Sequence, residues 1–106
     1  MGKDGWLAVG WPKEHGGQGL SATEQLIFFE EANIAGAPLP FVTISTVGPA
    51  LMESGSEAQK ARFLPGIASG ELIFAIGYSE PQAGSDLAVL KTQAKLEGDL
   101  DRKSTR

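Results

Sequence analysis

The spacing of apolar residues changes near residue 70, and this change constrains the fold more than any other feature of the chain. Before it, apolar residues recur every three or four positions in segments separated by glycine and proline, the pattern of amphipathic helices. From Leu72 to Ile76, five apolar residues follow one another in a run of strand length. The sequence therefore predicts a mainly α chain of helical hairpins, followed by the first short strands of a β domain.

Two helical segments are expected between residues 21 and 52. The first covers 21–34 and begins with Ser21 and Glu24, which have the spacing of a capping box. The second covers 41–52 and contains Gly48-Pro49. Because proline lacks an N–H group and its ring obstructs the preceding turn, we expect a kink there or a helix that restarts at the proline.

The other segments carry clear local signals. The glycine-rich stretch 16–19 predicts a loop. Ser56 caps a further helix, for which Leu64-Pro65 and Ser69-Gly70 provide exit signals. We expect one helical turn over 87–90 and a second short strand over 92–96. The run 72–76 is expected to be a short buried strand.

Length and composition allow one modest domain. A chain of 106 residues that is 42% hydrophobic can bury about 60–70% of its unfolded surface. We expect a helical N-terminal domain over 1–70 and the start of a β domain over 71–97. The charged tail 98–106 lacks an apolar period, so we expect it to fray and take it as foreign or truncated sequence.

Composition also excludes several classes of function. A net charge of -4 argues against a nucleic-acid partner. The chain has no cysteine and one histidine, His15, so neither a disulfide framework nor a zinc site is expected. No apolar run could serve as a secretory core or span a membrane, which favours a soluble intracellular protein. His15 is assigned to a turn, and Trp6 and Trp11 are expected to anchor the first helix.

The segment after the apolar run, residues 77–86, carries the chemistry. Ser79 and Ser85 supply hydroxyls, while Pro81 and Gly84 shape the backbone. These residues fit a strand-to-helix turn, and they also fit a cradle that offers hydroxyl and N–H donors to an anionic cofactor. Asp86 would be repelled by a pyrophosphate unless it turned to cap the following turn. The residues alone favour the plain turn.

Three motifs together resemble the acyl-CoA dehydrogenase family. They are Gly-Trp-Pro-Lys-Glu-His-Gly-Gly at 10–17, the segment 57–65 followed by Ser-Gly-Glu at 69–71, and Ser-Glu-Pro-Gln-Ala-Gly-Ser-Asp at 79–86. Their order and spacing are more specific than any single motif, and the resemblance covers about 5–97. It implies a flavoenzyme with a helical N-terminal domain, a middle β domain and a C-terminal helical bundle, assembled as a homo- or hetero-oligomer.

The resemblance implies α,β-desaturation of an acyl-CoA, with FAD as cofactor and an electron-transfer flavoprotein as acceptor. The family's catalytic base is a glutamate of the C-terminal bundle, so no catalytic residue is assigned here and Glu80 is taken as a structural carboxylate. This fragment alone should be inactive and should bind flavin weakly. Acyl-CoA oxidases and nitroalkane oxidases look similar in this region, and a non-catalytic helical interaction module is an alternative. The expected compartment is the cytoplasm, or the mitochondrial matrix in a eukaryote.

The resemblance also implies which residues contact the cofactor. Ser79 matches the residue that faces the N1/O2 edge of the flavin ring, where donors favour the reduced state. Ile76 and Tyr78 would lie in the strand that packs on the ring. Gly84 and Ser85 would lie near the pyrophosphate and the acyl-thioester entrance, so Ser85 is also a candidate substrate contact. The helices, including 39–52, would form one wall of the acyl pocket, although ordinary core packing is the simpler interpretation. The break at 36–40 resembles that of relatives acting on bulky acyl groups.

Overall fold

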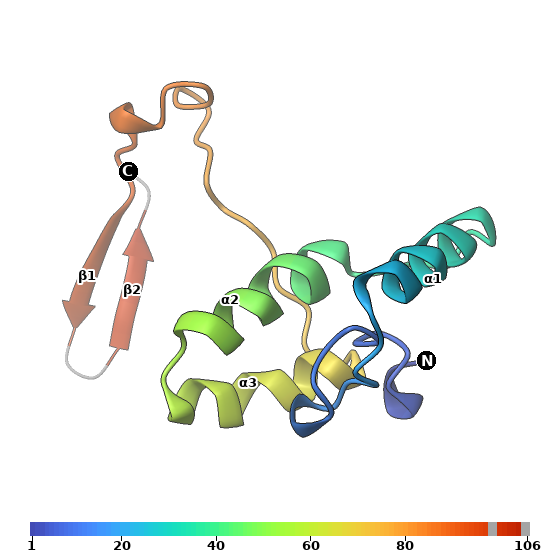
Figure 1. The fold of residues 1–106 in the computed structure, drawn as a ribbon. Helices are drawn as coiled ribbons and strands as arrows, with labels where there is room; N and C mark the ends of the chain where they lie inside the picture. The colour runs from blue at the N-terminus through green and yellow to red at the C-terminus, as the bar shows by residue number, and fades with distance from the viewer. Residues whose placement is uncertain (98–99, 105–106) are drawn as a thin grey trace. The chain divides into compact units, whose positions relative to one another are not determined.

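The structure is a computed structural model that describes residues 1–97 and 100–104. It divides into two compact units, Met1–Ala75 and Ile76–Arg106. The first unit contains the α-helices, and the second contains a loop, a short helical turn and two paired strands (Figure 1). The predicted mainly α fold is confirmed. The expected domain boundary after residue 70 lies inside the first unit.

The first long helix, α1 (Ala22–Ile34), begins where the capping signal predicted. The Glu24 N–H donates to the Ser21 hydroxyl at 3.3 Å, and the Glu24 carboxylate accepts from the Ser21 N–H at 2.8 Å. Two N–H groups that no helical carbonyl can reach are thus satisfied by side chains. Two short 3-10 turns precede this helix, η1 (Gly2–Asp4) and η2 (Lys13–His15).

The helix α3 (Glu57–Ser69) also begins with a capping box, in which Ser56 and Gln59 exchange hydrogen bonds of 2.8 and 3.2 Å. It continues through Pro65, the first of the two expected exit signals, and ends at the second, Ser69-Gly70. Gly70 then ends it with a φ of 81°, a left-handed conformation that glycine adopts without steric strain.

The segment between these helices is helical, with a change of geometry where a kink was expected. A π-helical turn, η3 (Thr43–Val47), passes directly into α2 (Gly48–Ser54). The Gly48 N–H donates to the carbonyl of Thr43, one residue further back than in an α-helix. Pro49 then occupies the first turn of α2, where its missing N–H is tolerated.

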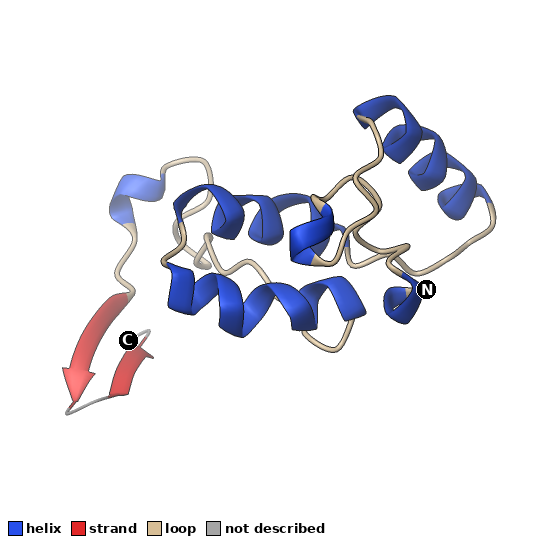
Figure 2. Ribbon diagram, turned by 60° about the horizontal axis from the view of Figure 1, so that its bottom comes forward, coloured by secondary structure: helices blue, strands red, loops and turns tan. Residues whose placement is uncertain are grey.

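The core of the helical unit lies between its N-terminal segment, η3 and α3. α2 packs against α3, and the two lie side by side in both ribbon views (Figures 1 and 2). The buried cluster consists of Leu7, Ala8, Trp11, Ile44, Leu64, Ile67 and Ala68. No helix in the described ranges is long and apolar enough to cross a membrane.

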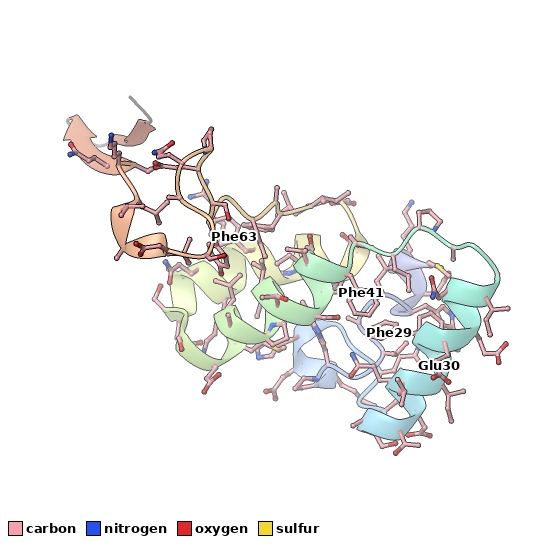
Figure 3. All side chains as sticks on the ribbon, turned by 90° about the horizontal axis from the view of Figure 1, so that it is seen from above. Phe29, Glu30, Phe41 and Phe63 are labelled. Carbon is pink, nitrogen blue, oxygen red and sulfur yellow. The ribbon has the colours of Figure 1, made fainter. Side chains whose placement is uncertain are left out.

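Aromatic contacts hold α1 to the rest of its unit. The Trp6 ring stacks on Phe28 with centroids 5.6 Å apart, and Phe29 lies 5.1 Å from Phe41. Figure 3 shows Phe29 and Phe41 turned toward each other. The contact of Trp6 agrees with its expected role in anchoring the first helix. Trp11 is buried in the core, where its indole N–H bonds to Ile44 of η3.

The predicted buried strand over 72–76 is wrong. The segment is extended but pairs with no other strand among the described residues, and Ile73 is 74% exposed. Two of its residues are held from outside the segment. The Leu72 N–H donates to the carbonyl of Gly66 at 2.9 Å, and Phe74 makes two main-chain hydrogen bonds with the Thr43 hydroxyl, of 2.8 Å from its N–H and 3.3 Å to its carbonyl. An apolar run becomes a strand only where a neighbouring segment supplies a hydrogen-bonding edge.

The second unit contains the predicted helical turn, η4 (Leu87–Val89), and two strands. β1 (Gln93–Glu97) coincides closely with the strand expected over 92–96. It pairs antiparallel with β2 (Leu100–Ser104), so the expectation of a frayed tail is wrong for residues 100–104. The same expectation for 98, 99, 105 and 106 lies outside the described residues.

Candidate functional site

The candidate loop begins with a tight turn at residues 80–83. Glu80 and Ala83 exchange main-chain hydrogen bonds, each of 3.0 Å, and Pro81 occupies the second position of the turn. Its fixed φ suits that position. Because the paired residues run antiparallel, their outer neighbours Ser79 and Gly84 are the next residues on the two arms of the turn.

All the site residues that we predicted are exposed: Ile76, Tyr78, Ser79, Gly84 and Ser85. Within the described ranges, the hydroxyls of Ser79 and Ser85 have no hydrogen-bond partner. A Cβ built on Gly84 would meet nothing within 4 Å. The turn therefore offers unused donors beside an open stretch of backbone, an arrangement that fits a phosphate or an electron-rich ring edge.

These residues are brought together only in part. The turn brings Ser79 and Gly84 near each other, and Ser85 follows directly. Ile76 lies in the extended segment before the turn, without an interaction to it among the described residues. Tyr78 is 64% exposed and lines a small cleft of about 250 Å³ with Gly77, Leu87, Leu90 and Thr92.

The carboxylate of Asp86 is engaged by η4. Its Oδ1 accepts a hydrogen bond of 3.1 Å from the Ala88 N–H, the capping interaction expected from sequence. A carboxylate so close to Ser85 would repel a bound anion if it faced the same way. The capping bond holds one of its oxygens at the helical turn.

Glu80 is the most highly connected side chain of the loop. Its oxygens accept from the main-chain N–H groups of Lys91 at 3.1 Å and Thr92 at 2.6 Å. They also accept from the Thr92 hydroxyl and the Gln82 amide. These bonds, the Thr92 hydroxyl first and the Lys91 N–H next, lower the pKa of Glu80. A carboxylate so occupied is a poor general base, in agreement with the structural role expected for it.

The helical unit contains an apolar groove of about 440 Å³ beside the segment 41–52. Its lining includes Trp11, Leu26, Phe29, Phe41, Ile44 and Met52. A groove of this size and character suits a large apolar group. The predicted wall of an acyl pocket, the helices that include 39–52, thus borders a real hollow.

A second hollow of about 460 Å³ lies between α3 and the N-terminal 3-10 turns. Most of its charged groups are paired: Lys60 lies 3.1 Å from Glu57, and the His15 ring lies 3.8 Å from Glu14. Lys3, which also lines the hollow, makes no ion pair with a described residue. His15 itself belongs to η2, a local turn. A single unpaired cation is not a convergent set of donors, so we do not assign the functional site to this hollow.

Sequence reasoning missed the partners of Glu80. Lys91 and Thr92 contribute main-chain N–H groups, which every residue except proline possesses, so their residue types carry no signal. The hydroxyl of Thr92, the first residue of the strand predicted over 92–96, was the available cue, and it is a weak one.

Known proteins match almost the whole chain. The profile of a family described as acyl-CoA dehydrogenase, N-terminal domain, matches residues 1–71. Among curated proteins, acyl-CoA dehydrogenase FadE26 of Mycobacterium tuberculosis is 64% identical over 93% of this chain and 25% of its own length.

Two solved structures are similarly close. The ChsE4-ChsE5 complex from Mycobacterium tuberculosis has 60% identity and a TM-score of 0.89, over 99% of this chain and 27% of that one. The Tcur3481-Tcur3483 steroid ACAD has 57% identity and a TM-score of 0.90, over 98% and 27%. Matches this complete reach into 98–106, which we expected to lie outside the family. The chain spans about a quarter of the length of these relatives.

Proposed function

Since the chain belongs to the acyl-CoA dehydrogenase family, we propose that it forms the first part of an FAD-dependent enzyme that desaturates an acyl-CoA thioester. Residues 1–70 are assigned to the helical N-terminal domain and 71–97 to the start of the middle β domain. The observation that carries the proposal is the exposed turn in which Ser79 and Ser85 keep their hydroxyls unpaired within the described ranges.

We assign the flavin contacts to that turn. The Ser79 hydroxyl and N–H would donate to the N1/O2 edge of the ring, and Ser85 beside the open backbone of Gly84 would donate near the pyrophosphate and the thioester. Ile76 and Tyr78 would pack on the ring. The chemistry that FAD supplies when bound is acceptance of the hydride that leaves the β-carbon.

The proton from the α-carbon is assigned to a base outside this chain. Glu80 is unsuited to that role, because its oxygens are occupied by Gln82, Lys91 and Thr92 and its pKa is lowered by them. The contribution of this chain is to orient the cofactor with fixed donors and to bind the acyl group. By itself it should turn over no substrate.

A bulky, steroid-bearing acyl group is the substrate class that we favour. One solved relative, Tcur3481-Tcur3483, is a steroid ACAD. The groove of about 440 Å³ beside 41–52 is lined mostly by apolar and aromatic side chains, which suits a rigid ring system. The break at 36–40, similar to that of relatives acting on bulky acyl groups, points the same way.

We propose that the complete enzyme is a hetero-oligomer that passes electrons to an electron-transfer flavoprotein. Both solved relatives, Tcur3481-Tcur3483 and ChsE4-ChsE5, are named for two different chains. In this chain, α1 exposes Leu26, Ile27 and Ile34, the last of them 81% exposed. A helix with apolar residues on more than one face is normally buried, so further protein should cover it in the complete enzyme.

The experiment uses the full-length enzyme that contains this chain, purified with any partner chain that accompanies it. We expect it to retain FAD on gel filtration. A steroid-bearing acyl-CoA should bleach the flavin absorbance under anaerobic conditions faster than a straight-chain acyl-CoA. Slow reoxidation by oxygen and rapid reoxidation by an electron-transfer flavoprotein would identify a dehydrogenase rather than an oxidase. A full-length protein that retains no flavin would contradict the proposal.

A further inference from the structure

Glu80 lies next to Ser79 in the chain, but its carboxylate reaches the far end of the loop. It accepts hydrogen bonds from the N–H groups of Lys91 and Thr92, at 3.1 and 2.6 Å. These two residues immediately precede β1. One side chain therefore joins the two ends of segment 80–92, in which Gly84 and Ser85 lie.

The main chain of Glu80 is held as well. Its N–H and carbonyl both pair with Ala83, which is 1% exposed. Glu80 is thus fixed to the turn by its backbone and to the start of the hairpin by its side chain. Residues on either side of such a point have little freedom to rotate.

We propose that Glu80 is a positioning residue for the flavin site: by closing segment 80–92 it holds the donors of Ser79 and Ser85 in one arrangement. This inference rests on the proposed flavin contacts of the turn. Donors fixed before a ligand binds need not be ordered when it binds, and they stabilise developing charge most effectively. A loop with free ends would first have to lose its conformational entropy.

The ionised carboxylate is specifically suited to this role. Both of its oxygens accept hydrogen bonds, and hydrogen bonds to a charged acceptor are stronger than neutral ones. Glutamine has the same shape but carries two donors on one arm, which would face the N–H groups that now point at an oxygen. Glu80→Gln should therefore open the loop while leaving the volume unchanged.

The test uses the full-length, flavin-loaded enzyme with Glu80→Gln, and with Glu24→Gln as the matched control. Glu24 also accepts a hydroxyl and an N–H, but its role is to cap α1. We expect Glu80→Gln to speed amide hydrogen exchange of Lys91 and Thr92 about tenfold or more. It should also shift the flavin midpoint potential in the same negative direction as Ser79→Ala, because Ser79→Ala removes the donor at the ring edge and Glu80→Gln leaves that donor unfixed. Glu24→Gln should change neither quantity.

Non-additivity separates positioning from a direct effect of charge. If Glu80 acts through Ser79, the double variant should shift the potential no further than Ser79→Ala alone, whereas independent effects would add. Additive shifts, or an unchanged potential in Glu80→Gln, would overturn the proposal. If Glu80→Gln loses its flavin, the potential is measured in Thr92→Val instead. This substitution removes one hydrogen-bond donor to the Glu80 carboxylate and keeps the shape of the Thr92 side chain. It should shift the potential the same way, and an unchanged potential would count against the role.

The amide-exchange measurement also works without flavin. Unchanged exchange in Glu80→Gln would refute the closure of the loop whatever the cofactor. Exchange that is faster in Glu80→Gln than in wild type, in an enzyme that binds no flavin, would instead confirm the closure while contradicting the proposed function and, with it, the positioning role.

Discussion

The indole N–H of Trp11 donates a hydrogen bond of 3.1 Å to the main-chain carbonyl of Ile44, deep in the helical unit. In the π-turn, the Gly48 N–H bonds to Thr43, and the next residue, Pro49, has no N–H to offer. The carbonyl of Ile44 is thus left without a helical donor, and Trp11 supplies one. The carbonyl group that the π-turn leaves unbonded is therefore satisfied by a side chain distant in sequence.

Trp11→Phe should destabilise the helical unit. The substitution keeps an aromatic ring but leaves the buried Ile44 carbonyl without a donor, which costs about 1–3 kcal/mol. Urea unfolding of the purified chain measures the difference. Trp6→Phe is the control, because Trp6 is 42% exposed and should change stability by less than about 1 kcal/mol. Equal effects of the two substitutions would contradict this role of the Trp11 indole.

Gly48→Ala should also destabilise the chain, for a steric reason. A Cβ at this position would lie 1.9 Å from the Trp11 ring, so the ring or the helix must move. Overpacking of this kind typically costs about 1–3 kcal/mol. Gly84→Ala, where a Cβ meets nothing within 4 Å, should leave the unfolding midpoint nearly unchanged. Equal unfolding midpoints for Gly48→Ala and Gly84→Ala would contradict the prediction.

Ser56→Ala should weaken α3 at its start. The hydroxyl accepts the Gln59 N–H at 3.2 Å, and loss of such a cap costs about 1 kcal/mol. Ser56→Asp, which can also cap, should recover most of the loss. Circular dichroism during thermal unfolding reports both, and the prediction is wrong if the aspartate variant melts no higher than the alanine variant.

Two glutamates should make stability depend on pH. Bonds from Ser21, its hydroxyl first, lower the pKa of Glu24, and the Thr92 hydroxyl is the main cause that lowers the pKa of Glu80. A lowered folded-state pKa stabilises the fold above the unfolded pKa, about 4.3 for glutamate, and this stabilisation is lost as the pH falls through the folded value. At pH 7 the free energy of unfolding should be higher for the wild type than for the double variant Glu24→Gln/Glu80→Gln. This difference in stability should shrink as the pH falls below about 4.3. A difference that stays constant from pH 7 to pH 3 would contradict the assignment.

The parts of the fold that sequence predicts are those that depend on near neighbours. Ser21 with Glu24 and Ser56 with Gln59 satisfy N–H groups three residues away, so residue types alone locate both helix starts. The run 72–76 shows the opposite case. Its residue types suit a strand, but a strand requires a partner edge. The anchored residues of the run bond elsewhere, Leu72 to the carbonyl of Gly66 and Phe74 to the Thr43 side chain.

The candidate site was predictable to a similar degree. Ser79 and Ser85 could be named because their motif is continuous, and the bend at Pro81 follows from its fixed φ. The hydrogen bonds by which the Glu80 side chain joins the two ends of segment 80–92 could not be predicted. The donors are main-chain N–H groups eleven and twelve residues away. Such groups have no signature in a single sequence.

The most direct test of the central claim is the dissociation constant of FAD from the full-length enzyme, compared between wild type and Ser79→Ala/Ser85→Ala. If these hydroxyls hold the cofactor, losing both should weaken binding about tenfold or more. Ser54→Ala, on the helical unit, serves as the control and should bind FAD as wild type does. An unchanged dissociation constant in the double variant would contradict the assignment of the turn as the flavin site.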